Sequence, residues 1–364
     1  MDFPSAGELQ QTTAPNDGCN DRVARRIHGS GELFRIAAEA TFVVWHRRPR
    51  RSGNLCESIA STPPDDPAAC LPQGFEMVIR ILCLLWLSLL TGSPAAGAEP
   101  RQDRCVVLIS IDGLAGFYFD DPLADMPTLR RLAAEGARAE GLVCSFPTVT
   151  WPNHTTLVTG VPPARHGVLG NNYLDRTSGE KIALIPDPLF DKDQIVLSPT
   201  IYDAAHNAGL STAGIVWPAT RNARTLDWTV PDMGGDGWDK YGTPVWMDEL
   251  RKDSIPVDKH AEWVKATGGG VQRDWMYSRL ARHLFEKHPV NLMLIHLVEV
   301  DHVQHKFGPR TPEAYWSVSY ADDRVRDIVE AAAASEFAGR TTFVIASDHG
   351  FFPIEKDIRP NVRL

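Results

Sequence analysis

The sequence predicts an α/β fold with a largely parallel central sheet. Continuous apolar runs of strand length alternate with helical patterns along the chain, as expected when helices cover both faces of a parallel sheet. Three of these runs lead directly into acidic residues, and sheets of this type bind ligands beyond the carboxyl ends of their strands. We therefore expect a functional site at that edge of the sheet.

The composition is that of a mildly acidic globular protein. The 364 residues are 43% hydrophobic and 23% charged, with a formal net charge of −9 and a pI of about 5.7. This balance argues against a nucleic-acid scaffold, whose surface is usually basic. A protein of this charge that handles an anionic phosphate ester needs local positive charge, which bound metal ions supply.

Residues 77–98 have the pattern of a secretory signal peptide. A short basic start, an apolar run from Ile81 to Leu90 and an Ala-x-Ala ending follow one another. The run is short for a membrane span, which leaves a buried helix or membrane anchor as the weaker alternative. Residues 1–76 are rich in Arg, Pro and Ser, so we expect a non-native extension or disorder there. The expected product is a secreted or periplasmic protein with no stable membrane span, whose folded domain covers residues 99–364.

The first strand and helix of that domain are clearly marked. Val106–Ile111 is a continuous apolar run, which is typical of a strand covered on both faces. A helix follows from Pro127, with Leu129 and Leu132 on one face, and Gly136 ends it.

The next unit places Thr150 at the start of a helix. Residues 137–144 form a strand-like run, and the helix has Pro152 in its first turn and closes at Gly160. Taken alone, such a Thr is a helix cap. The position also favours an anion, because the free backbone N–H groups and the helix dipole point toward it.

The alternation continues to the end of the chain. After a loop at 162–173 we expect a helix that starts at Ser198 and is ended by Gly209, followed by a strand at 212–217. Residues 218–270 are rich in Gly, Pro, Asp and Trp and are predicted to be an irregular insertion. The last predicted elements are a helix at 271–288, a strand at 291–298, a helix at 311–334 and a strand at 341–347.

Acidic residues at the strand ends form a candidate metal site. Asp112, Asp301 and Asp348 each follow a predicted strand. A single Asp there is usually a turn former, whereas three of them, two with histidines nearby, indicate metal ligation. Asp301 and His305 share one face if their segment forms a helical turn, and His349 directly follows Asp348.

Mixed Asp and His ligation suits zinc, and manganese or iron less well. Two such ions about 4 Å apart stabilise the attacking and leaving oxygens of a phosphoryl displacement. Thr150 is then the candidate nucleophile.

Four motifs lie in order along residues 104–355. They are Ile109-Ser110-Ile111-Asp112-Gly113, Phe146-Pro147-Thr148-Val149-Thr150-Trp151-Pro152-Asn153-His154, Asp301-x-x-x-His305-x-x-Gly308-Pro309 and Ser347-Asp348-His349-Gly350. Together they resemble the motifs of the nucleotide pyrophosphatase/phosphodiesterase family, the type I phosphodiesterases of the alkaline phosphatase superfamily. The resemblance implies an alkaline phosphatase-like α/β/α sandwich that hydrolyses phosphate diesters or nucleotide pyrophosphate bonds with two zinc ions.

The resemblance also implies roles for individual residues. One zinc ion would be held by Asp112, Thr150, Asp348 and His349. The other would be held by Asp301, His305 and a further His. Asn171 and the backbone N–H of Trp151 would bind a non-bridging phosphate oxygen. The reaction would pass through a phospho-threonine at Thr150, which water then hydrolyses.

Two features depart from the family pattern. No His follows His349, so the resemblance implies that the last ligand and the carboxyl-terminal part of the core are missing. Nucleotide-cleaving members stack the base between the aromatic residue after the nucleophile and a second aromatic residue. Trp151 fits the first position, but His296 occupies the second, which weakens the inference to a nucleotide.

The main hypothesis is therefore a phosphodiesterase that acts on a small phosphate ester, with a nucleotide as one candidate. The alternatives are a phosphomonoesterase or phosphonate hydrolase with the same core, and a truncated inactive remnant. We expect His154, Glu299 and His302 to be structural or to support the ligands. Cys105 and Cys144 are expected to be ordinary thiols rather than a disulfide.

Overall fold

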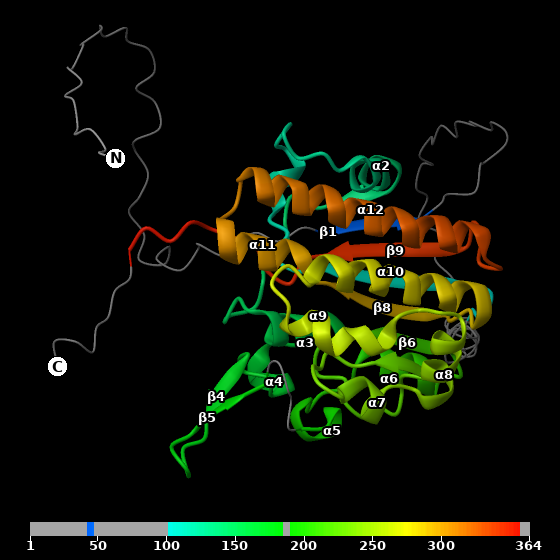
Figure 1. Ribbon diagram of the computed structural model, residues 1–364, viewed down its shortest axis with the longest axis horizontal. Helices are drawn as coiled ribbons and strands as arrows, with labels where there is room; N and C mark the ends of the chain where they lie inside the picture. Colours follow the sequence, from blue (N-terminus) through cyan, green and yellow to red (C-terminus); the bar gives the residue numbers. More distant parts are fainter. Residues whose placement is uncertain (1–41, 47–100, 185–189, 357–364) are drawn as a thin grey trace, which may run out of the picture. The chain divides into compact units, whose positions relative to one another are not determined.

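The computed structural model describes residues 42–46, 101–184 and 190–356 (Figure 1). The predicted signal peptide lies outside these residues. Within the described part of the chain, no helix is long and apolar enough to cross a membrane.

A seven-stranded sheet forms the centre of the fold, in the order β3-β1-β9-β2-β8-β6-β7. Its strands are β1 (Phe42–His46), β2 (Cys105–Ile111), β3 (Ala137–Arg138), β6 (Thr212–Ile215), β7 (Trp228–Val230), β8 (Leu292–Leu297) and β9 (Thr341–Ala346). The run from β9 through β2, β8 and β6 to β7 is parallel, whereas β1 is antiparallel to both β9 and β3. The prediction of an α/β fold with a largely parallel sheet is confirmed.

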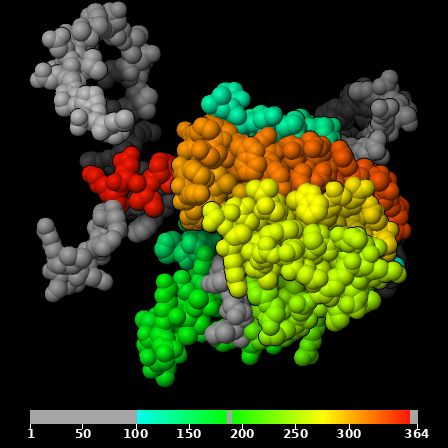
Figure 2. Space-filling view, viewed as in Figure 1, coloured from blue at the N-terminus to red at the C-terminus, as the bar shows by residue number. Residues whose placement is uncertain are grey.

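Helices cover both faces of the sheet, because successive side chains of a strand point to opposite sides. From β2, Val107 and Ile109 join a core cluster on one face and Leu108 joins a second cluster on the other. The first cluster includes residues of α2 (Pro127–Glu135), α8 (Pro244–Lys252), α10 (Gly270–Lys287) and α12 (Pro312–Ala334). The second includes residues of α3 (Thr150–Thr159) and α6 (Ile201–Asn207). Side chains of α10 and α12 form the continuous layer seen in Figure 2.

Two predictions for the edge of the sheet need correction. The strand expected at 137–144 covers only Ala137–Arg138, because Glu140 and Gly141 interrupt the apolar run and Gly weakens a strand. Phe42–His46 lies in the segment expected to be disordered, yet it pairs along the whole length of β9. Its aromatic and β-branched residues favour a strand, and the edge of β9 offers unpaired backbone groups.

The insertion at 218–270 is more regular than predicted. It contributes β7 to the sheet and contains α7 (Gly237–Tyr241), α8, the 3-10 helix η2 (Val257–Lys259) and α9 (His260–Lys265). Trp246, Met247 and Leu250 place one face of α8 in the core. The many Gly and Pro residues between these short elements hid the helical spacing of the apolar residues.

The remaining elements are short, apart from α11 at the site. The loop predicted at 162–173 contains α4 (Pro163–His166) and leads into a hairpin of β4 (Asn172–Leu174) and β5 (Lys181–Ala183). The others are the 3-10 helix η1 (Gly116–Phe119), α5 (Lys192–Ile195) and α11 (Glu299–Phe307). Cys105 and Cys144 are not joined to each other by a disulfide.

Candidate active site and metal centre

The predicted acidic residues meet at one edge of the sheet. Strands β9, β2 and β8 are parallel neighbours, so their carboxyl ends lie side by side. Asp112 follows β2, Asp348 follows β9, and Asp301 lies in the first turn of α11, which begins just after β8.

His349 lies among these three carboxylates. Its Nε2 is 3.3 Å from Oδ1 of Asp112, 3.4 Å from Oδ2 of Asp348 and 3.8 Å from Oδ1 of Asp301. One ligand atom each of Asp112, Asp301 and His349 lies within 4.8 Å of the others, a spacing that could hold a metal ion. These three residues reach this spacing from three separate segments of the chain.

Each of the three carboxylates has a buried oxygen without a hydrogen-bond donor. These are Oδ1 of Asp112, Oδ1 of Asp301 and Oδ2 of Asp348. Buried polar atoms are normally paired, and an unpaired carboxylate oxygen in the interior is costly. A divalent cation is the partner that suits three carboxylates and an imidazole, so the residues fit a bound metal.

The electrostatics of the cluster support the same conclusion. Burial and the nearby Asp301 raise the pKa of Asp112 to about 8, and burial and Asp112 raise the pKa of Asp348 well above its usual range. Burial alone would lower the pKa of His349, but Asp348, Asp112 and Asp301 outweigh it and raise the pKa to about 9. Without a cation, the folded protein can hold these groups together only by keeping protons on them.

His296 supports Asp112 at the same edge of the sheet. Its Nε2 is 2.9 Å from Oδ2 of Asp112 and its Nδ1 is 3.2 Å from the carbonyl oxygen of Val216. The ring is almost fully buried and packs against His154. A histidine held in this way fixes the orientation of a metal-binding carboxylate.

Thr150 lies at the start of α3 and caps nothing. The N-cap is Val149, in an extended conformation and without a side-chain cap hydrogen bond, so the capping interpretation of Thr150 is wrong. Thr150 lines a cavity of about 300 Å³ together with Asp112, Asn171, Asp301 and His305. Thr150 therefore lines the same cavity as three of the metal-ligand candidates, Asp112, Asp301 and His305.

Asn153 and His154 hold the chain around Thr150. The side chain of Asn153 accepts from the N–H of Ser145 and donates to the carbonyls of Ser145, Pro147 and Val149 at 3.1–3.2 Å. His154 is buried and its Nδ1 lies 2.8 Å from the carbonyl oxygen of Thr150. Both residues fix the loop and the first turn that present the Thr150 hydroxyl.

The structure corrects the role expected for the Trp151 side chain. The indole has no exposed surface, packs in a core cluster and donates through Nε1 to Asp232, 3.3 Å away. It cannot stack on a nucleotide base in this conformation. The backbone N–H of Trp151 donates to Oδ1 of Asn171 at 2.9 Å. The side-chain oxygen of Asn171, and not its amide nitrogen, therefore contacts this N–H.

The predicted pairing of Asp301 and His305 is present. The two residues lie four apart on α11, with Nε2 of His305 3.3 Å from Oδ1 of Asp301. Burial raises the pKa of Asp301, but the nearby imidazoles of His305, His349 and His302 together outweigh it and lower the pKa below its usual value. Asp274 orients the start of α11, because its carboxylate accepts from the N–H groups of Val298 and Glu299.

Three further polar residues of the cavity were missed by the sequence analysis: Asp232, His260 and Arg273. Asp232 follows β7 by two residues, so the strand-end signal would have found it had β7 been recognised. Arg273 brings the positive charge that the sequence near Thr150 lacks, and its guanidinium donates to Nε2 of His302 at 3.2 Å. No local pattern on α10 marks Arg273 as a site residue.

Comparison with known proteins identifies the family to which the sequence is similar. Residues 106–363 match the family model of type I phosphodiesterases/nucleotide pyrophosphatases. Human ectonucleotide pyrophosphatase/phosphodiesterase family member 7 is 26% identical over 72% of this chain and 52% of its own length. A bis(5′-adenosyl)-triphosphatase of Mus musculus is 24% identical over 78% of this chain and 54% of its own length. The chain thus spans about half the length of the curated relatives it matches.

Solved structures support the fold. A phosphonoacetate hydrolase from Sinorhizobium meliloti 1021, in complex with phosphonoacetate, matches with a TM-score of 0.50 and 21% identity. The match covers 71% of this chain and 59% of that one.

Proposed function

Because the chain belongs to the type I phosphodiesterase/nucleotide pyrophosphatase family, we propose that it hydrolyses phosphate diesters or nucleotide pyrophosphate bonds with Thr150 as the nucleophile. One observation carries the proposal. Thr150 begins α3 without capping it and lines a cavity shared with Asp112 and Asp301, each of which has one oxygen without a hydrogen-bond donor. A free hydroxyl beside a cation-binding carboxylate cluster is the arrangement that phosphoryl transfer to a threonine requires.

We propose two zinc ions as the cofactor. Asp112, Thr150, Asp348 and His349 would hold one, and Asp301 and His305 would contribute to the other. The ions, when bound, would supply the positive charge that favours the ionised hydroxyl and stabilises the phosphoryl oxygens in the transition state. The unpaired carboxylate oxygens support this assignment.

The protein's own groups would then do the following. Oγ of Thr150 forms a bond to phosphorus while the bond from phosphorus to the leaving oxygen breaks, and water later cleaves the Thr150 ester. The side chain of Asn171 and the backbone N–H of Trp151 hydrogen-bond each other and so lie close together. Once this hydrogen bond breaks, both can donate to one phosphoryl oxygen of the substrate. His296 keeps Asp112 oriented throughout.

The charge of the cavity favours a diester over a monoester. Among the residues that line it, Arg273 is the one Lys or Arg side chain. A monoester carries an additional negative charge that a second cation would need to meet. A phosphomonoesterase or a phosphonate hydrolase is therefore the second candidate, and a nucleotide remains a substrate candidate because of the triphosphatase named among the relatives.

Hydrolysis of a chromogenic diester against the matching monoester tests the proposal. We expect faster release of 4-nitrophenol from the diester, with loss of activity in chelator and in Thr150→Ala. Thr150→Ser should retain part of the activity, and Thr159→Ala, at the other end of α3, is the matched control. Diesterase activity that survives chelation and Thr150→Ala would contradict the mechanism. One zinc ion or none per chain, with no turnover, would instead support the inactive remnant.

We also propose that the protein is secreted or periplasmic, on the basis of the signal-like pattern at 77–98. Amino-terminal sequencing of exported protein tests this: a start near Glu99 supports it, and a start at Met1 contradicts it.

A further inference from the structure

We propose that Phe351 is a positioning residue of the metal centre, whose ring holds the imidazole of His305 in the orientation that binds zinc. The inference rests on the proposed zinc cofactor and adds to it a residue that is not itself a ligand. Phe351 follows the Asp348-His349-Gly350 motif directly and is half-buried. Its ring meets that of His305 edge to face, with the ring centroids 4.9 Å apart and an interplanar angle of 82°. This is a favoured geometry for two aromatic rings.

His305 is the most exposed of the Asp and His residues proposed as ligands. Its side chain is 70% exposed, whereas the others are at most 14% exposed. Nε2 of His305 lies 3.3 Å from Asp301, but its Nδ1 has no hydrogen-bond partner within the described part of the chain. A metal-binding imidazole is normally fixed through its other nitrogen, as Nδ1 of His349 is by the carbonyl oxygen of Gly350, 3.1 Å away. Another contact must therefore fix the ring of His305.

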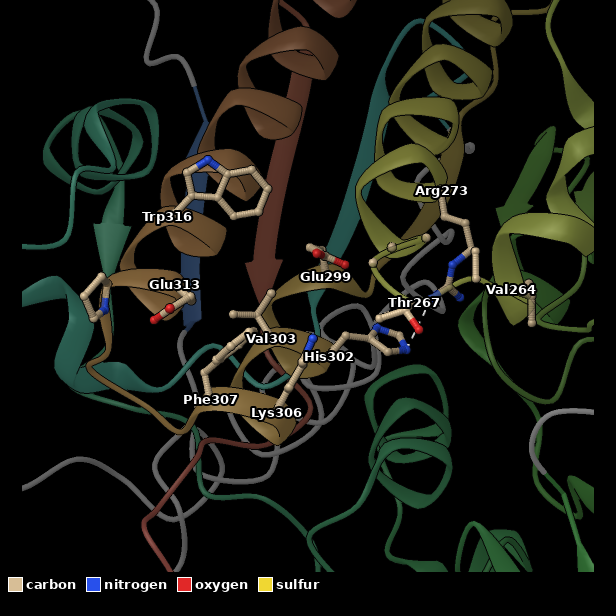
Figure 3. A pocket seen from close by; sticks show the side chains of 15 residues that line it. Val264, Thr267, Arg273, Glu299, His302, Val303, Lys306, Phe307, Glu313 and Trp316 are labelled. Atoms are coloured by element: carbon tan, nitrogen blue, oxygen red, sulfur yellow. Dashed lines mark hydrogen bonds between the residues drawn. The ribbon is translucent and has the colours of Figure 1, made fainter. Parts of the chain in front are cut away.

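Helix α11 gives this imidazole little support, because the helix lies between two cavities. His305 lines the cavity of the candidate metal centre. Val303, Lys306 and Phe307 of the same helix line a second cavity of about 590 Å³ (Figure 3). Within the described residues, the aromatic ring in contact with His305 is that of Phe351, which comes from the segment after β9.

The ring of Phe351 is itself held by the turn that follows β2. Gly113 leaves room for it, since a Cβ at this position would lie 3.1 Å from Cδ2 and Cε2 of Phe351. The φ of +70° at Gly113 favours glycine for a second reason. The N–H of Gly113 donates to Oδ1 of Asp348 at 3.3 Å, so the ring packs against a turn that is tied to the metal-ligand candidates. A side chain fixed in this way can restrain a more mobile one.

Phe351 also contacts His349, with the ring centroids 6.1 Å apart. The two imidazoles that it touches are proposed to bind different zinc ions. His349 is held in addition by Gly350 and by the carboxylates around it, whereas His305 has Asp301 alone. Loss of the ring should therefore weaken the ion bound by His305 more than the ion bound by His349.

Zinc titration in competition with a chelating dye tests the proposal on the full chain. Phe351→Leu keeps an apolar side chain against Gly113 but removes the ring edge. We expect it to weaken the more loosely bound zinc ion about tenfold, as is usual when a residue that orients a ligand is lost. Phe351→Tyr should restore most of the affinity. Phe352→Ala is the matched control, because Phe352 is 67% exposed and has no ring contact within the described residues, so its affinity should be unchanged.

A double-mutant cycle with His305→Ala shows whether the effect passes through that imidazole. His305→Ala should weaken the same zinc ion, and the addition of Phe351→Leu should then cause little further loss. Zinc should also raise the melting temperature of Phe351→Leu less than that of the wild type, each compared with its own value in chelator. A residue that only stabilises the metal-free fold would leave this shift unchanged.

The outcomes separate this inference from the proposed function. Unchanged zinc affinity in Phe351→Leu, or an equal loss in the His305→Ala background, would overturn the role of Phe351 and leave diester hydrolysis untouched. A loss of zinc affinity that depends on His305, in a chain that hydrolyses no diester, would support the role of Phe351 and count against the proposed function alone.

Discussion

Asp112→Asn replaces the carboxylate that follows β2 with a neutral amide of the same shape. The amide can still hydrogen-bond Nε2 of His296, through either its oxygen or its NH2 group, so the packing around the residue is kept. What changes is the charge in a buried cluster that also contains Asp301 and Asp348. We expect this variant to be more stable than the wild type when no metal is present.

The pKa of Asp112 gives the sign and the size of the effect. Burial and Asp301 raise it from 3.8 to about 8, so the unfolded chain releases this proton at a lower pH than the folded protein does. The folded state is therefore penalised as the pH rises above 3.8, by about 1.4 kcal/mol per pH unit until the folded group also ionises. At pH 7 the penalty is about 4 kcal/mol, and Asp112→Asn removes it.

Urea unfolding in chelator at pH 4 and pH 7 measures this difference. The two proteins should be similar at pH 4, and the variant should be more stable by up to about 4 kcal/mol at pH 7. Zinc at a hundredfold excess over Kd should narrow the difference, since the wild type gains about 2.7 kcal/mol and the variant gains less. Asp248→Asn, at an exposed carboxylate on α8, is the control and should change stability by less than about 0.5 kcal/mol. A variant that is less stable than the wild type at pH 7 in chelator would refute the reasoning.

Three further predictions follow from named contacts. Burial and Arg273 lower the pKa of His260 from 6.5 to about 3. The free energy of unfolding should therefore fall by up to about 1.4 kcal/mol per pH unit as the pH drops between these values. His260→Gln should flatten this slope in acid unfolding curves, and an unchanged slope would count against the prediction. His296→Gln should weaken zinc binding about 10- to 100-fold, because Asp112 loses the hydrogen bond that orients it. Competition with a chelating dye measures this affinity, and an unaltered value would contradict the role of His296 in orienting Asp112. Asn153→Ala breaks four hydrogen bonds of the loop before α3, so the melting temperature and kcat should both fall, whereas a normal kcat would separate the loop from catalysis.

Much of the metal centre could be predicted because it depends on local rules. Parallel neighbouring strands bring their carboxyl ends together, so Asp112 and Asp348 had to meet once β2 and β9 were recognised as such strands. Asp301 and His305 share a face of α11 for the same kind of local reason, since helical periodicity places residues four apart side by side.

The rest of the site depends on tertiary packing that no local pattern encodes. Asp232 was hidden because β7 is three residues long and lies among Gly and Pro. Arg273 reaches the cavity from the first turn of α10. The apolar pattern of this helix indicates only its buried face. The burial of the Trp151 ring is set by the side chains that surround it, which no local pattern indicates.

The pairing of Phe42–His46 with β9 has a similar origin. Strand propensity was visible in this segment, but its partner lies some 300 positions later in the chain, from Thr342 to Ala346. Long-range pairing of this kind is decided by which sheet edge is open, and that information appears only in the fold.

The proposed mechanism depends above all on the attack of the Thr150 hydroxyl oxygen on phosphorus. The most direct measurement is mass spectrometry of protein quenched in acid within milliseconds of mixing with thymidine 5′-(4-nitrophenyl phosphate) and zinc. The account predicts that the peptide containing Thr150 gains the mass of thymidine monophosphate less water, and that Thr150→Ala shows no adduct. Rapid release of 4-nitrophenol with no adduct on that peptide, or with the adduct on another residue, would contradict it.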